Sequence, residues 1–186
     1  MPYQVLRSGC RLLKVLDMRK APLDTIPDEV FRLYYGGFNA YLQAEDVQSF
    51  KAPYKIGCLL SLQKLCFIDA NETVVIKEIG KLTQLQRLGI TKLRRDHGKE
   101  LCSSLANLTN LRSLNVHADV GEALDLQYAM SASASTFPFL RCLVLNGSLD
   151  TLPEWIPSLN ALTMLRLSWS GLREDPLEFL QVCPIY

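Results

Sequence analysis

The residue types that most often do chemistry are present in this chain, but their spacing forms no catalytic or metal-binding pattern. The two histidines, His97 and His117, have no partner at metal-ligand spacing, and no serine lies in the motif G-x-S-x-G. Six cysteines occur at wide, uneven intervals without a C-x-x-C pair, which argues against a zinc site or a disulfide framework. They are Cys10, Cys58, Cys66, Cys102, Cys142 and Cys183. We therefore expect no enzyme activity, cofactor or metal, and interpret the cysteines as small apolar residues in a reducing compartment.

One segment gathers positive charge around a histidine. It contains four cations and one carboxylate: Lys92, Arg94, Arg95, Asp96 and Lys99, with His97 among them. Such a group could contact phosphate, but no aromatic residue that stacks on a base accompanies it. The net charge of +1 also provides no overall field that would attract nucleic acid or an anionic membrane. We expect a solvated convex loop here, with no nucleic-acid partner.

Composition and length favour a single domain with a continuous core. The chain has 186 residues, of which 48% are hydrophobic and 21% charged. No segment has the roughly 18 consecutive apolar residues of a membrane span, and the N-terminus has no signal-peptide run. These features favour a cytoplasmic location without a membrane partner. Three glycosylation sequons, at Asn71, Asn107 and Asn146, leave a secreted protein as the alternative.

The strongest signal is an internal repeat. Four apolar residues recur in the order apolar, two variable, apolar, two variable, apolar, one variable, apolar. The six copies begin at Cys10, Leu59, Leu82, Leu108, Phe137 and Leu159. Their second positions, 13, 62, 85, 111, 140 and 162, are 22 to 29 residues apart except for one gap of 49. This period is typical of leucine-rich repeats, and the long gap, about two periods, indicates one further repeat whose residues do not fit the frame.

The frame predicts an α/β solenoid, a leucine-rich-repeat horseshoe. The alternation at the end of each frame predicts short strands that stack as a parallel sheet on the concave face. These strands are expected near 15–18, 64–67, 87–90, 113–116, 142–145 and 164–167. On the convex face the chain returns in short helices or irregular turns, because stacked repeats bury one another's apolar faces. The expected return segments are Pro27–Leu33, Ile76–Leu82, Lys99–Leu108, Glu122–Met130, Pro153–Leu159 and Pro176–Gln181.

The amino-acid sequences of the repeats resemble the repeat region of one family of plant proteins. The segments that carry the resemblance are LKVLDM (13–18), PLDTIPDEV (22–30), IGKLTQLQRLGI (79–90) and LPEWIP (152–157). They are similar to the coiled-coil, nucleotide-binding, leucine-rich-repeat disease-resistance proteins, which are intracellular immune receptors. The resemblance covers most of the chain outside about 34–50. It implies binding of a pathogen effector, of a guarded host protein or of the receptor's own switch domain.

The chain also departs from that family. The nucleotide-binding switch domain needs the motif G-x-x-x-x-G-K-[ST], but Val75 replaces its first glycine and Leu82 follows Gly80 and Lys81. Residues 34–57 do not follow the frame, and we expect a degenerate repeat or linker there. The expected organisation is a first repeat at 1–33, this linker, and five repeats at 58–186. Neither end resembles a polar cap, so we expect an excerpt of a longer solenoid that can self-associate through uncapped ends.

The candidate site is the concave face, where variable strand residues point away from the core. Arginine and tryptophan, which are common interface hot spots, recur there, and we expect a mildly basic surface that receives an acidic partner. The candidate binding residues are Lys14, Asp17, Arg19, Lys64, Arg87, Arg112, Asn115, His117, Arg141, Asn146, Arg166 and Trp169. Other expected concave positions are Val15, Cys66, Ile68, Gly89, Thr91, Ser113, Cys142, Val144, Met164 and Ser168. Lys14, Arg112 and Arg141 occupy equivalent positions and are expected to line one edge. Exposed strand positions are polar in any soluble sheet, so a merely solvated face is the alternative interpretation.

The sequence thus favours a protein-recognition module, the repeat portion of a plant immune receptor. Two alternatives stay open: a free-standing repeat scaffold, and a truncated remnant without independent activity. Stability of the isolated chain as a monomer separates them, because uncapped apolar repeat edges predict association.

Overall fold

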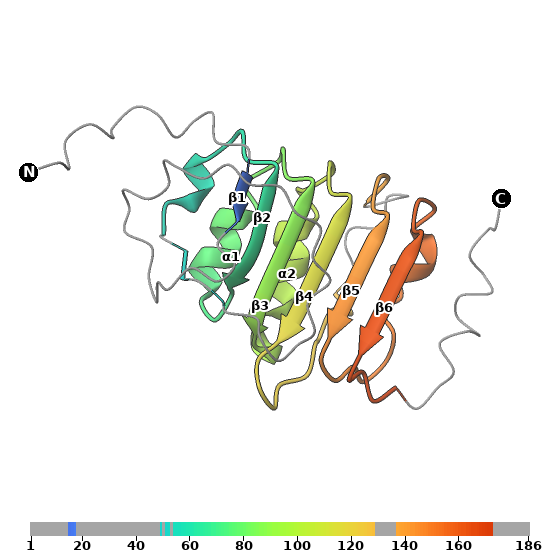
Figure 1. Cartoon of the computed structure of the whole chain (residues 1–186). Coiled ribbons are helices and arrows are strands. Elements are labelled where there is room, and N and C mark those ends of the chain that lie inside the picture. The colour runs from blue at the N-terminus through green and yellow to red at the C-terminus, as the bar shows by residue number, and fades with distance from the viewer. Residues whose placement is uncertain (1–14, 18–48, 50, 53, 129–136, 173–186) are drawn as a thin grey trace, which may run out of the picture.

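The computed structural model describes residues 15–17, 49, 51–52, 54–128 and 137–172. In this part of the chain six strands form one parallel sheet, and each strand pairs with the next one in sequence (Figure 1). The strands are β1 (Val15–Asp17), β2 (Lys64–Asp69), β3 (Arg87–Leu93), β4 (Ser113–Ala118), β5 (Cys142–Asn146) and β6 (Met164–Ser168). Each observed strand overlaps its predicted range. The predicted leucine-rich-repeat solenoid is therefore confirmed.

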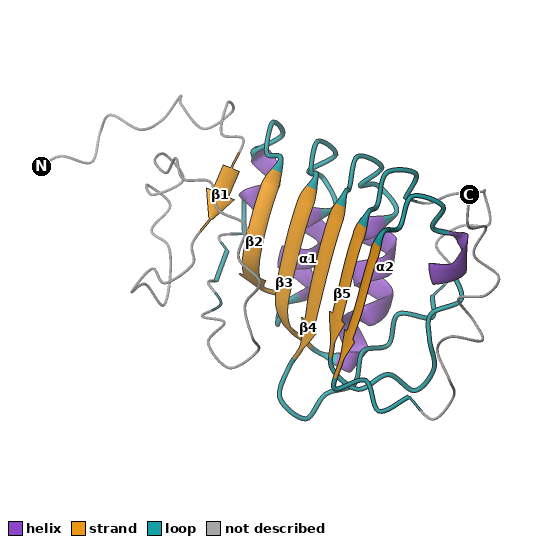
Figure 2. Ribbon diagram, turned by 45° about the vertical axis from the view of Figure 1, so that its right-hand side comes forward, coloured by secondary structure: helices purple, strands orange, loops and turns teal. Residues whose placement is uncertain are grey.

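The connections return behind the sheet in short helical pieces. Figures 1 and 2 show α1 (Thr73–Ile79) and α2 (Gly98–Leu105) on one side of the sheet, and none of the described helices lies on the other side, the open face. Single turns of 3₁₀ helix occupy η4 (Ile56–Cys58), η5 (Arg95–His97) and η6 (Ile156–Ser158). Hence α1, α2 and η6 overlap predicted return segments. The first and last predicted return segments lie outside the described residues.

The core forms where equivalent apolar residues of successive repeats align. Strand register places one leucine of each of five strands side by side: Leu65, Leu88, Leu114, Leu143 and Leu165. The first four of these are buried, and the last, on the outermost described strand, is half-buried. Helix residues such as Ile76, Leu101 and Leu105 close the core from behind. Burial of this kind contributes about 25 cal/mol per Å² of apolar surface, so stacking of the repeats is the main stabilising term.

The sequence frame is wrong by one residue at the end of β2. It predicts that Phe67 points into the core and Ile68 onto the open face, but Ile68 is buried and Phe67 is half-buried. The register with β3 shifts between Leu65 and Ile68, so that Ile68 pairs with Ile90. Phe67 adopts a positive φ of 62° at this irregularity. The bulge adds one residue and thereby turns the following side chain inward.

Thr91 also differs from its predicted place. The frame predicts it on the open face, but it is buried, and its hydroxyl donates a hydrogen bond to the Ile68 carbonyl at 3.1 Å. Its backbone carbonyl accepts the Ala70 amide at 2.9 Å. Thr91 thus ties β3 to the bulged end of β2 and contributes nothing to the open surface.

The return segment after β4 contains no helix over Glu122–Tyr128. Leu124 and Leu126 are buried, whereas Ala123 and Asp125 are half-buried, which is the alternation of an extended chain. Ala123 forms an isolated parallel bridge with Ser148, and the Leu124 amide donates to the Ser148 carbonyl at 2.7 Å. Burial of alternate leucines therefore outweighs the helical spacing of the apolar residues in this segment.

None of the described helices is long and apolar enough to cross a lipid bilayer. The predicted first repeat and most of the predicted linker at 34–57 lie outside the described residues, so these boundaries stay predictions.

Candidate protein-binding face

The open face of the sheet is built from the strand positions that alternate with the buried leucines. Register aligns one such row across five strands: Lys64, Arg87, Ser113, Cys142 and Met164. A second row follows two residues later and contains Gly89, Asn115, Val144 and Arg166. Because side chains in a strand alternate between the two faces, the frame that buries the leucines also places these rows on the open face. Gly89 is the exception in exposure, because it is buried against the backbone of Cys66 and Phe67 in the bulged part of β2.

Positive charge is distributed over this face. Arg87, Arg112, Arg141 and Arg166 are exposed, and Lys64 is half-buried. The Arg141 amide donates to the Arg112 carbonyl at 2.9 Å, so the two arginines occupy equivalent places at the start of neighbouring strands. Across β2 to β6, the two rows and the residues just before each strand contain these five cations and no carboxylate. This part of the face is therefore basic.

Three further predicted residues lie nearer the carboxyl ends of the strands. Asn146 Nδ2 and His117 Nδ1 are 3.1 Å apart, across neighbouring strands β5 and β4. Burial lowers the pKa of His117 below its ordinary value of 6.5, which favours the neutral ring. Asn115 Oδ1 and His117 Nε2 are buried and have no hydrogen-bond partner in the described part of the protein. A buried polar atom without a hydrogen-bond partner lowers the stability of the fold, unless a further polar group reaches it.

Trp169 directly follows β6, is 80% exposed and has a positive φ of 56°. By contrast, the other tryptophan, Trp155, donates its indole N–H to the Leu126 carbonyl at 2.9 Å and packs edge-on against Phe137. The exposed ring of Trp169 is thus available to a partner, whereas Trp155 is a packing residue. Of the remaining predicted site residues, Asp17 lies at the end of β1, where the strand register places its backbone beside that of Cys66 in β2. Lys14 and Arg19 lie outside the described residues.

An open groove at the carboxyl ends of β4 to β6 was not predicted. It has a volume of about 590 Å³, and the predicted residues that line it are His117, Asn146 and Trp169. The charged residues that line it are Arg95, Asp119, Glu122 and Asp150. No spacing motif marks these carboxylates, because Asp119 and Glu122 come from the loop after β4 and Asp150 from the loop after β5.

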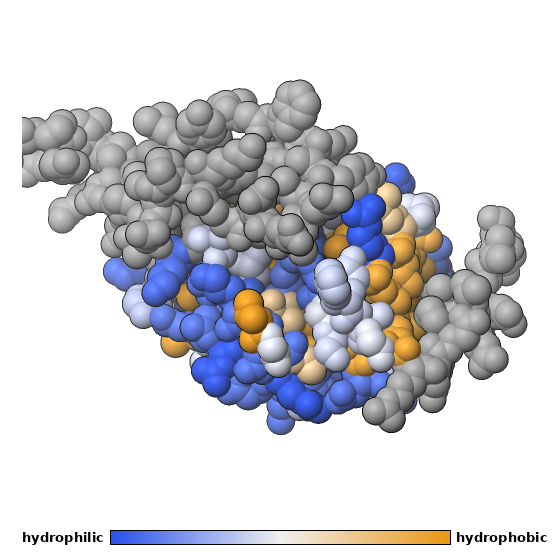
Figure 3. All heavy atoms as spheres, turned by 60° about the horizontal axis from the view of Figure 1, so that its bottom comes forward, coloured by the Kyte–Doolittle hydropathy of each residue, from blue (hydrophilic) through white to orange (hydrophobic). Residues whose placement is uncertain are grey.

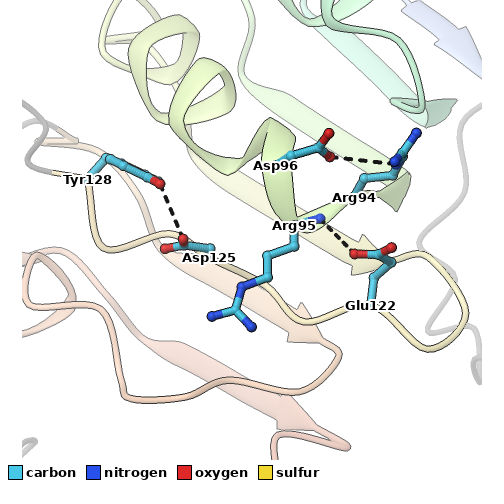
Figure 4. Close-up of a pocket in the computed structure, with 6 residues that line it drawn as sticks. All are labelled: Arg94, Arg95, Asp96, Glu122, Asp125 and Tyr128. Atoms are coloured by element: carbon cyan, nitrogen blue, oxygen red, sulfur yellow. Dashed lines mark hydrogen bonds and ion pairs between the residues drawn. The ribbon is translucent and has the colours of Figure 1, made fainter.

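The basic segment around His97 is balanced by carboxylates. Lys92 pairs with Asp69 at 3.1 Å, Arg94 with Asp96 at 3.5 Å, and Arg95 with Asp150 at 2.6 Å. Figure 4 shows the neighbouring pocket, of about 470 Å³, in which the Arg95 backbone N–H points to Glu122 and Tyr128 points to Asp125. These pairs leave little uncompensated positive charge for a phosphate backbone.

No described cluster suggests a metal centre or a nucleophile. Among the described residues, no group of three or more histidine, cysteine, aspartate or glutamate side chains is placed to hold a metal ion. Cys102 is buried in α2, and desolvation raises the pKa of its thiol to about 12, which opposes formation of the reactive thiolate.

Comparison with known proteins gives consistent matches. A family model described as a leucine-rich repeat region matches residues 9–185. The chain is 36% identical over 132 residues to disease resistance protein RPM1 of Arabidopsis thaliana, which covers 70% of this chain and 14% of that protein. It is 33% identical over 136 residues to disease resistance protein PIK6-NP of Oryza sativa subsp. japonica, and 32% identical to disease resistance protein Pik-2 of the same organism. Both rice matches cover 69% of this chain and 13% of the relative.

Proposed function

This chain belongs to the leucine-rich repeat region family, with repeats that match those of plant disease resistance proteins, and from this premise we propose that its open sheet face binds an acidic surface of a partner protein. The observation that carries the proposal is the set of five cations on β2 to β6 without a carboxylate in the same rows. Complementary charge of this kind steers association and selects partners.

The relatives suggest in which process this binding takes place. The chain spans only 13–14% of the relatives' length, so we propose, by analogy with these disease resistance proteins, both the class of partner and the role in defence. The partner is a pathogen effector, a guarded host protein or the switch domain of a longer receptor. The module then acts in plant defence, in the cytoplasm, through binding and without catalysis.

The test is a charge reversal on the face with a matched control behind the sheet. The variant is Arg112→Glu with Arg141→Glu, because both side chains are exposed and aligned. The control is Lys55→Glu with Lys99→Glu, which makes the same change of net charge at exposed positions on the helical side. Effectors and leaf proteins are screened against the wild-type chain, and each purified partner is then measured against all three proteins by calorimetry.

We expect the charge reversal on the face to weaken partner binding by about tenfold or more, since loss of one well-placed charge pair can cost about 1.4 kcal/mol. The control should bind as the wild type does, and added salt should weaken wild-type binding. Equal binding by all three proteins would contradict the proposal. A partner lost only from the control would place the interface on the helical side instead.

A further inference from the structure

We propose that the groove at the carboxyl ends of β4 to β6 binds a basic side chain, arginine or lysine, from a flexible segment of a protein partner. The site uses six residues from three repeats: His117, Asp119, Glu122, Asn146, Asp150 and Trp169. It is separate from the aligned arginines, which lie at the opposite ends of the same strands. The inference goes beyond the proposed function, because it concerns the opposite end of the strands and a ligand of the opposite charge.

The first argument is the charge of the groove. Three carboxylates line it, from Asp119, Glu122 and Asp150, against one cation, Arg95. His117 adds no charge near neutral pH, because its burial favours the neutral ring. An anion such as phosphate is therefore disfavoured, and a cation is attracted into the hollow. Figure 3 turns this end of the sheet toward the viewer and shows a described surface that is mostly hydrophilic at the left and bottom, with a broader apolar area at the right.

The second argument is that the groove already holds one guanidinium group of the chain itself. Arg95 Nη2 lies 2.6 Å from Asp150 Oδ2, and the Arg95 backbone N–H donates to Glu122 Oε2 at 3.1 Å. Asp119 is different, because its Oδ1 accepts only the Val120 amide, at 2.9 Å, and no described cation pairs with it. The Asp119 carboxylate is thus the position at which a second, incoming cation gains most.

The third argument is the aromatic and polar lining. The exposed Trp169 ring offers a face on which an arginine or lysine stem can stack while its charge reaches a carboxylate. Val120, which also lines the groove, is 99% exposed and supplies an apolar contact. His117 Nε2 is buried without a described partner beside this hollow. Tryptophan is one of the residue types that are enriched at the hot spots of protein interfaces.

The open shape of the groove favours an extended side chain as its ligand. The hollow is lined by loops rather than enclosed by walls, so it suits one extended side chain of a polypeptide better than a buried small molecule. A segment that carries such a side chain would cross the ends of β4 to β6 (Figure 1). A partner that also presents carboxylates toward Arg112 and Arg141 would then contact both ends of the same strands.

The experiment titrates the full chain, labelled with ¹⁵N, with an acetylated and amidated Gly-Arg-Gly peptide. The same peptide with glutamine or glutamate in place of arginine serves as the ligand control. We expect saturable shifts of the Trp169 indole, the Val120 amide and the Asn146 side-chain amide with the arginine peptide alone. Equal shifts with the glutamine peptide, or shifts confined to other regions, would overturn the proposal.

The variant for this site is Asp119→Asn with Glu122→Gln. Both replacements keep the oxygen that accepts the Val120 or Arg95 amide, so the loops keep their hydrogen bonds while two charges are removed. The matched control, Glu100→Gln with Glu154→Gln, removes two charges outside the groove. We expect the groove variant to bind the arginine peptide about threefold or more weakly, as loss of two exposed charge contacts implies, and the control to bind as the wild type does.

Two further variants distinguish peptide binding in the groove from an effect on folding and from binding at the basic face. Trp169→Ala changes an exposed side chain, so it should lose peptide binding without a change in the unfolding transition. Arg112→Glu with Arg141→Glu should retain peptide binding, which separates failure of this site from failure of the basic face. If Trp169→Ala binds the peptide as tightly as the wild type, the proposed site is wrong.

Discussion

Replacing Gly98 with alanine is expected to destabilise the fold strongly, because the first residue of α2 lies against the backbone of the next return segment. A Cβ at this position would lie 1.8 Å from the Asp125 carbonyl oxygen and 2.9 Å from its carbon. Cβ atoms essentially never approach other atoms within 3.0 Å, so α2 or the Asp125 backbone must move by more than 1 Å.

The Asp125 backbone cannot move that far at low cost. The Leu124 amide on one side is bonded to the Ser148 carbonyl, and the Leu126 carbonyl on the other side accepts the Trp155 indole N–H. Overpacking costs about 1–3 kcal/mol, and each hydrogen bond lost costs about 1 kcal/mol more. The gain in helix propensity is at most about 1 kcal/mol, so we expect a net loss of about 3 kcal/mol in the free energy of unfolding.

The assay is urea and thermal unfolding, followed by circular dichroism. A loss of about 3 kcal/mol corresponds to a decrease of roughly 6–12 °C in the midpoint for a domain of this size. Gly121→Ala is the control, because Gly121 has a φ of +78° but no atom within 4 Å of the position that an alanine methyl group would take. It should cost only about 1 kcal/mol, the penalty of the left-handed conformation. The reasoning is refuted if Gly98→Ala is no less stable than Gly121→Ala.

Three more predictions can be tested by unfolding measurements and by chemical labelling of cysteines. Leu114→Ala should lower the free energy of unfolding by about 2–5 kcal/mol because Leu114 is fully buried, whereas Ser113→Ala beside it should change it by about 0.5 kcal/mol or less. Burial lowers the pKa of His117 in the folded protein below 6.5, so as pH decreases the unfolded chain is protonated at this residue before the folded protein is. The free energy of unfolding should therefore fall as pH decreases through 6.5 toward the folded pKa, and His117→Gln should remove this component of the pH profile. Iodoacetamide at pH 8 should modify exposed Cys58 in the native protein but not Cys102, whose thiol has a pKa of about 12, and peptide mass mapping that finds both equally labelled would contradict its burial.

The architecture was predictable because its determinants are local and repeated. A leucine frame every 22–29 residues specifies a short strand and a turn in each copy, and stacking of the copies follows from burial of their apolar faces. The strands around Leu88, Leu114, Leu143 and Leu165 therefore occur where the frame places them. The frame failed at Phe67, because a bulge depends on the pairing of β2 with β3 and leaves no mark in the sequence period.

Side chains whose direction follows from strand alternation were also predictable, and Arg87, Arg112, Arg141 and Arg166 are exposed as expected. Thr91 was predicted wrongly, because its burial depends on the hydrogen bond that it donates across to β2. The prediction of short helices or irregular turns left the conformation of Glu122–Tyr128 open, and its extended form reflects bonds to Ser148, a residue of the next repeat.

The sequence by itself determined the repeat, the parallel order of the strands and the basic character of the open face. All three depend on periods of two residues or of one repeat, which a chain carries in its own order. Only the tertiary structure decided that Asp119, Glu122 and Asp150 share a groove with His117 and Trp169. These residues come from loops of three repeats, and their distances depend on how the repeats stack and on where each loop bonds to its neighbour. No local pattern records that geometry.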